Sequence, residues 1–303
     1  MLELDEKKIR KGKPIGLPYQ GSKKKISKKI VEIIKQNFGT DKPIYDIFGG
    51  GGAITAECLI NGLEVHYNDL DHTITDMFQR VLATDREFLK TLIISREDFF
   101  KIRDKQEKSV DDNLKMLVNS FGNDRRTYLY SEEKSDIKYN LAIEIIKNHD
   151  TFSGYKKTDT YKNTYRPFDI GKEKNNQVLQ QLTSLQQLER VQQLGQFEQL
   201  EDLRVTSLDY KDFSNVENAI LYLDPPYEGA TNKGYLIDGF DSQSFYDWAY
   251  KMSKKNIVII SSYEISDERF GCVYEFKKAR STLSQGTSGS KTEKLFMVKK
   301  GEE

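Results

Sequence analysis

Cysteine and histidine are scarce in this sequence. Its 303 residues include 2 cysteines, Cys58 and Cys272, and 3 histidines. Neither cysteine stands in a metal-binding spacing, and the histidines are too few and too scattered for a zinc site. We therefore expect no metal centre. The sparse cysteines also favour a reducing compartment over a disulfide framework.

Net charge and long hydrophobic runs are also missing. The 47 basic and 47 acidic residues cancel to a formal net charge of zero. A nucleic-acid-binding protein of this composition would have to segregate its charges, because phosphate neutralisation dominates such binding. No run approaches a membrane span, and residues 1–13 lack the apolar region of a signal peptide. We expect a soluble, cytoplasmic protein of one large domain, or a domain with an insertion.

The most informative stretch that is present reads Leu-Tyr-Leu-Asp-Pro-Pro-Tyr and ends at Tyr227. The apolar run Ala219–Leu223 predicts a buried strand of a parallel sheet, and it stops at Asp224. Pro225 and Pro226 follow, and neither can donate to a sheet ladder. The pattern therefore puts one carboxylate on a stiff turn at the carboxyl end of a strand, where open α/β sheets bind ligands.

This corner suits the recognition of a planar amine. The Asp224 carboxylate accepts hydrogen bonds from an NH2 group, and backbone carbonyls at the two prolines can be held toward the same group. Tyr227 offers a flat face to a base. A nitrogen held in this way turns its lone pair toward an electrophile. The alternative is a plain strand-ending turn, in which Asp and Pro are ordinary residues.

A second pattern lies far upstream. Residues 42–48 predict a strand ending in Asp46 and Phe48, followed by four glycines, Gly49–Gly52, and a helix from Ala53. Strand, glycine turn and helix open a nucleoside-binding βαβ unit, since glycine allows close approach of a ligand. No Gly-Lys-Ser/Thr is present, which excludes a phosphate-binding P-loop. An acid beside the glycines repels phosphate and attracts a cation; a merely flexible loop is the alternative.

Acidic and basic residues flank this unit. Asp69 ends the next expected strand, Leu63–Asn68, where an acid suits a ribose diol, and Asp71 suits a helix N-cap. Upstream, Lys23 and Lys24 fall near the first turn of a helix expected over about 24–38, where the helix dipole disfavours cations. A compensating anion is expected there, unless this helix start simply faces solvent.

In these stretches the chain resembles the adenine-specific DNA methyltransferases of the Dam-like class (class alpha, D12 type), which use S-adenosylmethionine. Asp-Pro-Pro-Tyr matches their catalytic motif, and the order of motifs also matches. The likeness covers Leu17–Lys25, Ile44–Asp71 and Val205–Tyr227, and more loosely Arg280–Val298.

The resemblance implies an α/β fold: a doubly wound, mostly parallel, Rossmann-like sheet with helices on both faces. Residues 1–74 and 200–303 would form the catalytic domain that binds S-adenosylmethionine, and residues 75–199 an inserted, mainly helical target-recognition segment.

The resemblance also implies site residues. The catalytic residues would be Asp224, Pro225, Pro226 and Tyr227. The cofactor would contact Tyr19, Gly21, Lys23, Asp46, Phe48, Gly49, Gly50, Asp69, Asp209 and Asp224. Within this set, Lys23 is expected to meet the methionyl carboxylate. Asp209 would face the adenine amine of the cofactor, although it could equally cap a turn.

The middle of the chain mixes basic and aromatic residues within Asn119–Tyr130 and Thr151–Ile170. DNA contact needs both kinds, for phosphates and for unstacked bases, although surface loops have a similar composition. Arg125 and Arg126 are candidates to contact guanine edges. The full set of expected DNA contacts is Arg125, Arg126, Tyr128, Lys162, Arg166 and Arg280.

Residues 175–203 carry an apolar residue at every third position, with glutamine between. Such a stripe drifts round an α-helix of 3.6 residues per turn, although the composition favours helix. We expect a spacer or packing element.

The predicted function is site-specific methyl transfer from S-adenosylmethionine to the N6 amine of an adenine flipped out of double-stranded DNA. The same chemistry on cytosine in DNA, adenine in RNA or a glutamine amide is an alternative; the last class usually carries Asn in place of Asp224. A catalytically inactive DNA-binding relative is another. We expect a monomer or weak dimer, alone or beside a restriction endonuclease.

Overall fold

A seven-stranded mixed sheet forms the centre of the fold, with the strand order β3-β2-β1-β4-β5-β7-β6. The computed structural model describes residues 1–19, 21–165, 178–197, 200, 202–228, 240–276 and 292–299. The strands are β1 (Ile44–Asp46), β2 (Val65–Asn68), β3 (Arg204–Thr206), β4 (Ile220–Leu223), β5 (Ile257–Ser262), β6 (Phe270–Glu275) and β7 (Lys294–Val298). Strands β1 to β5 pair in parallel, and β7 runs antiparallel to both β5 and β6. The predicted mostly parallel α/β sheet is confirmed.

The direction of winding reverses between β1 and β4. Strand β1 pairs with β2 on one side and with β4 on the other, and Asp46 stands opposite Tyr222 in the β1–β4 register. The chain therefore leaves the carboxyl ends of both strands at the same edge of the sheet. In open α/β sheets this switch point is where a crevice for ligands forms.

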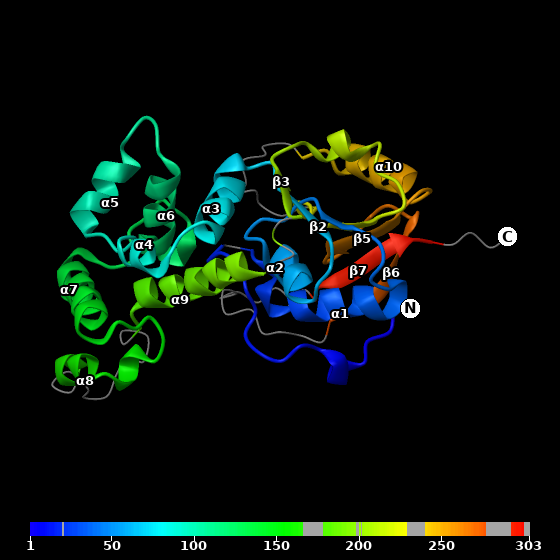
Figure 1. Cartoon of the computed structure of the whole chain (residues 1–303). Coiled ribbons are helices and arrows are strands. Elements are labelled where there is room, and N and C mark those ends of the chain that lie inside the picture. The colour runs from blue at the N-terminus through cyan, green and yellow to red at the C-terminus, as the bar shows by residue number, and fades with distance from the viewer. Residues whose placement is uncertain are drawn as a thin grey trace.

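Helices cover both faces of the sheet because β4 is apolar on both of its faces. Ile220 and Tyr222 pack in one core cluster with α1 (Ser27–Phe38) and α2 (Ala53–Ile60). Leu221 and Leu223, which point to the opposite face, pack in another cluster with α10 (Ser242–Met252). Figure 1 shows α1 and α2 on one side of the sheet and α10 on the other. The predicted layers of helices are thus present.

A helical part lies beside the sheet (Figure 1). Its helices are α3 (His72–Leu82), α4 (Arg86–Lys90), α5 (Arg96–Arg103), α6 (Val110–Asn119), α7 (Glu132–His149), α8 (Asp159–Tyr165) and α9 (Gln180–Gln193). All of these helices except α5 contribute to one core cluster, together with Leu17 of the N-terminal segment and Tyr67 of β2, and α5 packs in a second, smaller cluster. Met77, Val81 and Leu92 are fully buried in the larger cluster, and Phe88 is partly buried against it.

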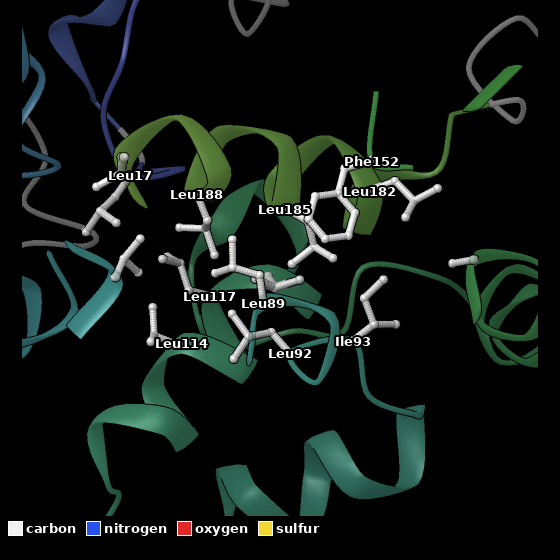
Figure 2. Close-up of a cluster of buried hydrophobic side chains, with 14 of the residues drawn as sticks. Leu17, Leu89, Leu92, Ile93, Leu114, Leu117, Phe152, Leu182, Leu185 and Leu188 are labelled. Carbon is white, nitrogen blue, oxygen red and sulfur yellow. The ribbon is translucent and has the colours of Figure 1, made fainter. Parts of the chain in front are cut away.

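The three-residue leucine repeat forms α9. Leu182, Leu185 and Leu188 are all fully buried. Steps of three residues advance by about 300° on an α-helix, so the stripe winds round the axis. It stays buried because α9 is in contact with α3, α4 and α6. Figure 2 shows these leucines among Leu89, Leu92, Ile93, Leu114 and Leu117. Of the stretch expected to be a spacer or packing element, the part that forms α9 is thus a packing element.

A polar contact joins α9 to the N-terminal segment. The Lys24 ammonium donates to the Leu17 carbonyl at 2.8 Å and also to the side-chain oxygen of Gln187. Burial and, to a smaller extent, the nearby Arg190 lower the pKa of Lys24 to about 8.

Truncation of a leucine in α9 tests this packing. We expect Leu185→Ala to lower the free energy of unfolding by about 2–5 kcal/mol, because it removes fully buried methyl groups and leaves a cavity. Gln193→Ala, at an exposed position of the same helix, should change it by about 0.5 kcal/mol or less. Urea unfolding followed by circular dichroism measures both, and equal effects would contradict the proposed role of the stripe.

Candidate functional site

A cavity of about 910 Å³ opens at the switch point. Its walls come from the N-terminal segment, the glycine turn, the ends of β1, β2 and β4, and residues of α5, α6 and the loop after α6. The volume suits a small organic ligand. Most of the predicted cofactor set lines it together: Tyr19, Gly21, Lys23, Asp46, Phe48, Gly49, Gly50, Asp69 and Asp224.

Asp46 closes β1 with one satisfied and one unsatisfied oxygen. Its side chain is 1% exposed. Oδ2 accepts from the Thr55 amide at 3.1 Å and from the Thr55 hydroxyl at 2.7 Å. Oδ1 has no hydrogen-bond partner among the described residues. Burial raises the pKa of Asp46 to about 7. A buried oxygen without a partner is costly, so this wall of the cavity favours a ligand that carries a donor or a positive charge.

The glycine turn is packed between aromatic rings. A Cβ on Gly49 would lie 2.4 Å from Cε2 of Tyr67. Gly52 has φ +68°, and a Cβ there would lie 2.5 Å from Cε2 of Phe78. The Tyr67 hydroxyl donates to the Gly50 carbonyl at 2.6 Å. The glycines are therefore required by close ring packing and by a left-handed backbone, which is a firmer reason than flexibility.

Asp69 is held under this turn. Its Oδ2 accepts from the Gly50 amide at 2.8 Å, and its Oδ1 accepts from the Asp71 amide at 2.9 Å. Burial raises the pKa of Asp69, whereas these two amides lower it. Asp71 caps α3, as expected, by accepting from the Thr73 amide at 3.0 Å. Its other oxygen, Oδ2, lies 3.2 Å from Nη2 of Arg125.

The Asp-Pro-Pro-Tyr corner carries a buried ion pair. Lys23 Nζ lies 2.8 Å from Asp224 Oδ1, with the two side chains 12% and 16% exposed. Burial raises the pKa of Asp224 to about 6; Lys23 opposes this shift and Glu293 adds to it. Lys23 reaches this position because Lys23–Lys25 form a separate 3-10 turn capped by Ser22, and the helix begins only at Ser27. The anion expected beside the N-terminal lysines is thus, in this structure, Asp224 itself.

Tyr227 is fixed at its hydroxyl and at its ring. The hydroxyl donates to Glu293 Oε1 at 2.7 Å and lies 3.2 Å from Asp224 Oδ1. The ring meets Tyr263 edge-on, with centroids 4.7 Å apart. Lys23 Nζ lies 4.9 Å from the centroid of the Tyr227 ring. Pro226 lines the cavity, next to Asp224.

The cavity has an acidic wall, formed by Asp46, Asp69, Asp71 and Asp224 at or just after strand ends, and a basic wall, formed by Arg103, Lys108, Arg125 and Arg126 of the helical part. The separation is partial, because Arg125 pairs with Asp71, Lys23 pairs with Asp224, and Asp124 also lines the cavity. No sequence pattern singles out Arg103 and Lys108, because the packing of α5 against α6 brings them to the cavity. The zero net charge of the chain thus conceals a site with one acidic and one basic side.

Asp209 and Lys162 are not among the described residues that line the cavity. Asp209 caps the short turn Tyr210–Phe213 in a reciprocal arrangement with Asp212. The alternative of a turn cap is therefore the observed one. Lys162 lies on α8, 3.6 Å from Asp159. Arg166 and Arg280 fall outside the described residues.

Tyr128 requires a correction. It was expected to contact DNA, but it is only 3% exposed. Its hydroxyl donates to the Ile94 carbonyl at 3.2 Å, and its ring packs edge-on against Phe99. Tyr128 therefore supports the loop that carries Arg125 and Arg126 from within. The alternation of basic and aromatic residues could not distinguish a supporting ring from an exposed one.

Two further findings concern metal-binding groups and membrane-spanning helices. Within the described ranges there is no group of three or more His, Cys, Asp or Glu residues that could hold a metal ion. The described helices also include none that is long and apolar enough to cross a membrane.

Comparison with known proteins agrees with this geometry. The model of one family, described as D12 class N6 adenine-specific DNA methyltransferase, matches residues 19–269, which is most of the chain. No curated protein matches the chain.

An added methyl group tests the packing of the glycine turn. We expect Gly49→Ala to lower the free energy of unfolding by about 1–3 kcal/mol, because its Cβ would overlap the buried Tyr67 ring. Gly271→Ala is the control, since its Cβ would meet only the flexible Lys299 side chain, at 3.2 Å, and should change stability by about 1 kcal/mol or less. Chemical unfolding of both variants gives the answer; a Gly49→Ala protein as stable as the parent would contradict the tight packing.

Proposed function

Because the chain belongs to the D12 class N6 adenine-specific DNA methyltransferases, we propose that its cavity binds S-adenosylmethionine and a flipped-out adenine side by side. The family makes the chain an adenine-specific DNA methyltransferase. The observation that carries the finer proposal is that Asp224 and the glycine turn line one cavity.

The acidic wall fits the proposed cofactor. S-adenosylmethionine supplies a methyl group on a positively charged sulfur, and it has an ammonium group but no phosphate. The unpartnered Oδ1 of Asp46 would accept from that ammonium, and Asp69 would accept from the ribose hydroxyls with its remaining lone pairs. Tyr19 and Gly50 would contact the adenosine. Lys23 binds Asp224 in this structure, so its proposed contact with the methionyl carboxylate requires it to reach both groups or to change partner.

Asp224 would orient the target amine. Its carboxylate accepts one N6 hydrogen and the Pro225 carbonyl accepts the other, which directs the nitrogen lone pair toward the methyl carbon. The new nitrogen–carbon bond forms as the carbon–sulfur bond breaks, and the electron pair of the broken bond stays on sulfur. The nitrogen then loses one proton, for which Asp224 is an adjacent base. Catalysis comes chiefly from positioning.

Stacking would offset part of the cost of flipping. Extrusion of a base costs about a few kcal/mol, and stacking on an aromatic ring returns roughly 1–3 kcal/mol. Tyr227 would provide that ring. Because Lys23 donates to the Tyr227 hydroxyl, its ammonium lies at the hydroxyl end of the ring, 4.9 Å from the centroid, and not over the face on which the base would stack.

The basic wall would face the DNA backbone. Arg103, Lys108 and Arg126 line the cavity from the helical part, and cations there suit phosphates. We therefore keep residues 75–199 as the proposed target-recognition insertion and residues 1–74 and 200–303 as the proposed catalytic domain. Lys162, Arg166 and Arg280 remain proposed DNA contacts.

Removal of Asp224 tests the catalytic assignment. We expect Asp224→Ala to lower the rate of adenine methylation by at least about a hundredfold. Binding of S-adenosylmethionine, measured by calorimetry, should persist because Asp46 and Asp69 are unchanged. Asp202→Ala removes an exposed acid and should retain the parent rate. Methylation by Asp224→Ala near the parent rate would exclude this role.

The pH dependence follows from the same residue. Burial raises the pKa of Asp224 to about 6, and only the ionised carboxylate accepts the amine hydrogen. Activity should therefore be present above pH 6 and fall roughly tenfold per pH unit below it. Initial rates with saturating DNA between pH 5 and 8 measure this, with circular dichroism at each pH to exclude unfolding. A rate that is flat down to about pH 4, the ordinary range of Asp, would contradict the raised pKa.

A further inference from the structure

A second acid lies directly behind the Asp-Pro-Pro-Tyr corner. Glu293 precedes β7, and its side chain is 15% exposed. Its Oε1 accepts from the Tyr227 hydroxyl at 2.7 Å and from the Ser261 hydroxyl of β5 at 2.8 Å. Lys23 Nζ lies 3.7 Å from the same oxygen. None of the roles proposed above uses this carboxylate.

Glu293 and Asp224 compete for one proton. The Tyr227 oxygen lies 2.7 Å from Glu293 Oε1 and 3.2 Å from Asp224 Oδ1. A hydroxyl has a single hydrogen to donate, and the shorter distance is the normal one for a hydroxyl donor. The hydrogen therefore points to Glu293. If residue 293 carried no acceptor, the Tyr227 hydroxyl would donate to Asp224 Oδ1 instead, and this oxygen already accepts from Lys23.

We propose that Glu293 is a positioning residue for methyl transfer, which keeps the Tyr227 hydroxyl on itself so that Asp224 can accept the hydrogen bond of the target amine. The inference rests on the proposed role of Asp224. The same contact fixes the distal end of the Tyr227 ring between β5 and β7, where Tyr263 meets it edge-on. Glu293 acts through Tyr227 and touches no reacting atom.

The negative charge of Glu293 affects the pKa of Asp224, and this effect can be measured separately from any structural support that Glu293 provides. The titratable groups around Asp224 are Lys23, Asp46, Tyr222, Tyr227, Tyr263 and Glu293. Burial is the largest cause of the raised pKa of Asp224; Lys23 lowers that pKa, and the negative charge of Glu293 raises it. Loss of the Glu293 charge should therefore lower the pKa of Asp224.

The first experiment removes only the charge. In Glu293→Gln, the amide oxygen can still accept from Tyr227 and Ser261. We expect the acidic limb of the pH–rate profile to move down by about one pH unit. Glu217→Gln is the matched control, because Glu217 is exposed and pairs with Lys255 on the surface; its profile should equal that of the parent. A limb that stays in place or moves up overturns the proposal.

The second experiment removes the acceptor. We expect Glu293→Ala to lower kcat about tenfold, since Tyr227 then donates to Asp224, with KM for S-adenosylmethionine changed by less than about threefold. In a Tyr227→Phe background the same substitution should have little further effect on kcat. Independent, multiplicative losses overturn the route through Tyr227. Thermal unfolding of each protein accompanies the rates, and if Glu293→Ala fails to fold, the Glu293→Gln profile decides.

The two proposals fail in different ways. If Asp224→Ala methylates DNA at the parent rate, the proposed function of the corner is wrong. If Asp224→Ala is inactive while the profile of Glu293→Gln matches the parent, the corner stands and only the role of Glu293 is refuted.

Discussion

The site depends on the burial of two carboxylates at the carboxyl ends of neighbouring strands. Asp46 closes β1 and Asp224 follows β4, and each raises the pKa of its neighbours within the same cavity. Two such acids repel each other and lose hydration, which a folded protein tolerates only with compensation. Asp46 has Thr55, and Asp224 has Lys23.

The reversal of winding between β1 and β4 explains why the two acids share a cavity. A sheet with a different strand order would carry the same motifs at separate places along its edge. The N-terminal segment then completes the site, because its 3-10 turn brings Lys23 across 201 positions of sequence, from residue 23 to residue 224, into contact with Asp224. The helical part supplies the basic wall, so the cavity belongs to both parts of the chain.

Much of this site can be predicted from short stretches of sequence. A strand that ends in an acid, followed by glycines or prolines, is a short-range pattern, and Asp46, Asp69 and Asp224 lie at the strand ends that the pattern predicts. Glu293 and Ser261 could not be found in this way, because the antiparallel pairing of β5 with β7 alone brings them to Tyr227. Arg103 and Lys108 could not be predicted either, because a long-range contact, the packing of α5 against α6, brings them to the cavity. The prediction for Tyr128 is wrong because composition does not indicate whether a ring is buried. The leucine repeat has a packing role because α3, α4 and α6 surround α9, which is a long-range arrangement that the repeat itself does not predict.

Lys23 and Lys24 are consecutive residues of one short turn with contacts in opposite directions. Lys23 binds Asp224 of the sheet, and Lys24 binds Gln187 of α9 and the Leu17 carbonyl. The same short turn therefore ties α9 of the helical part and Asp224 of the sheet part to one anchoring segment, through the ammonium groups of two neighbouring residues.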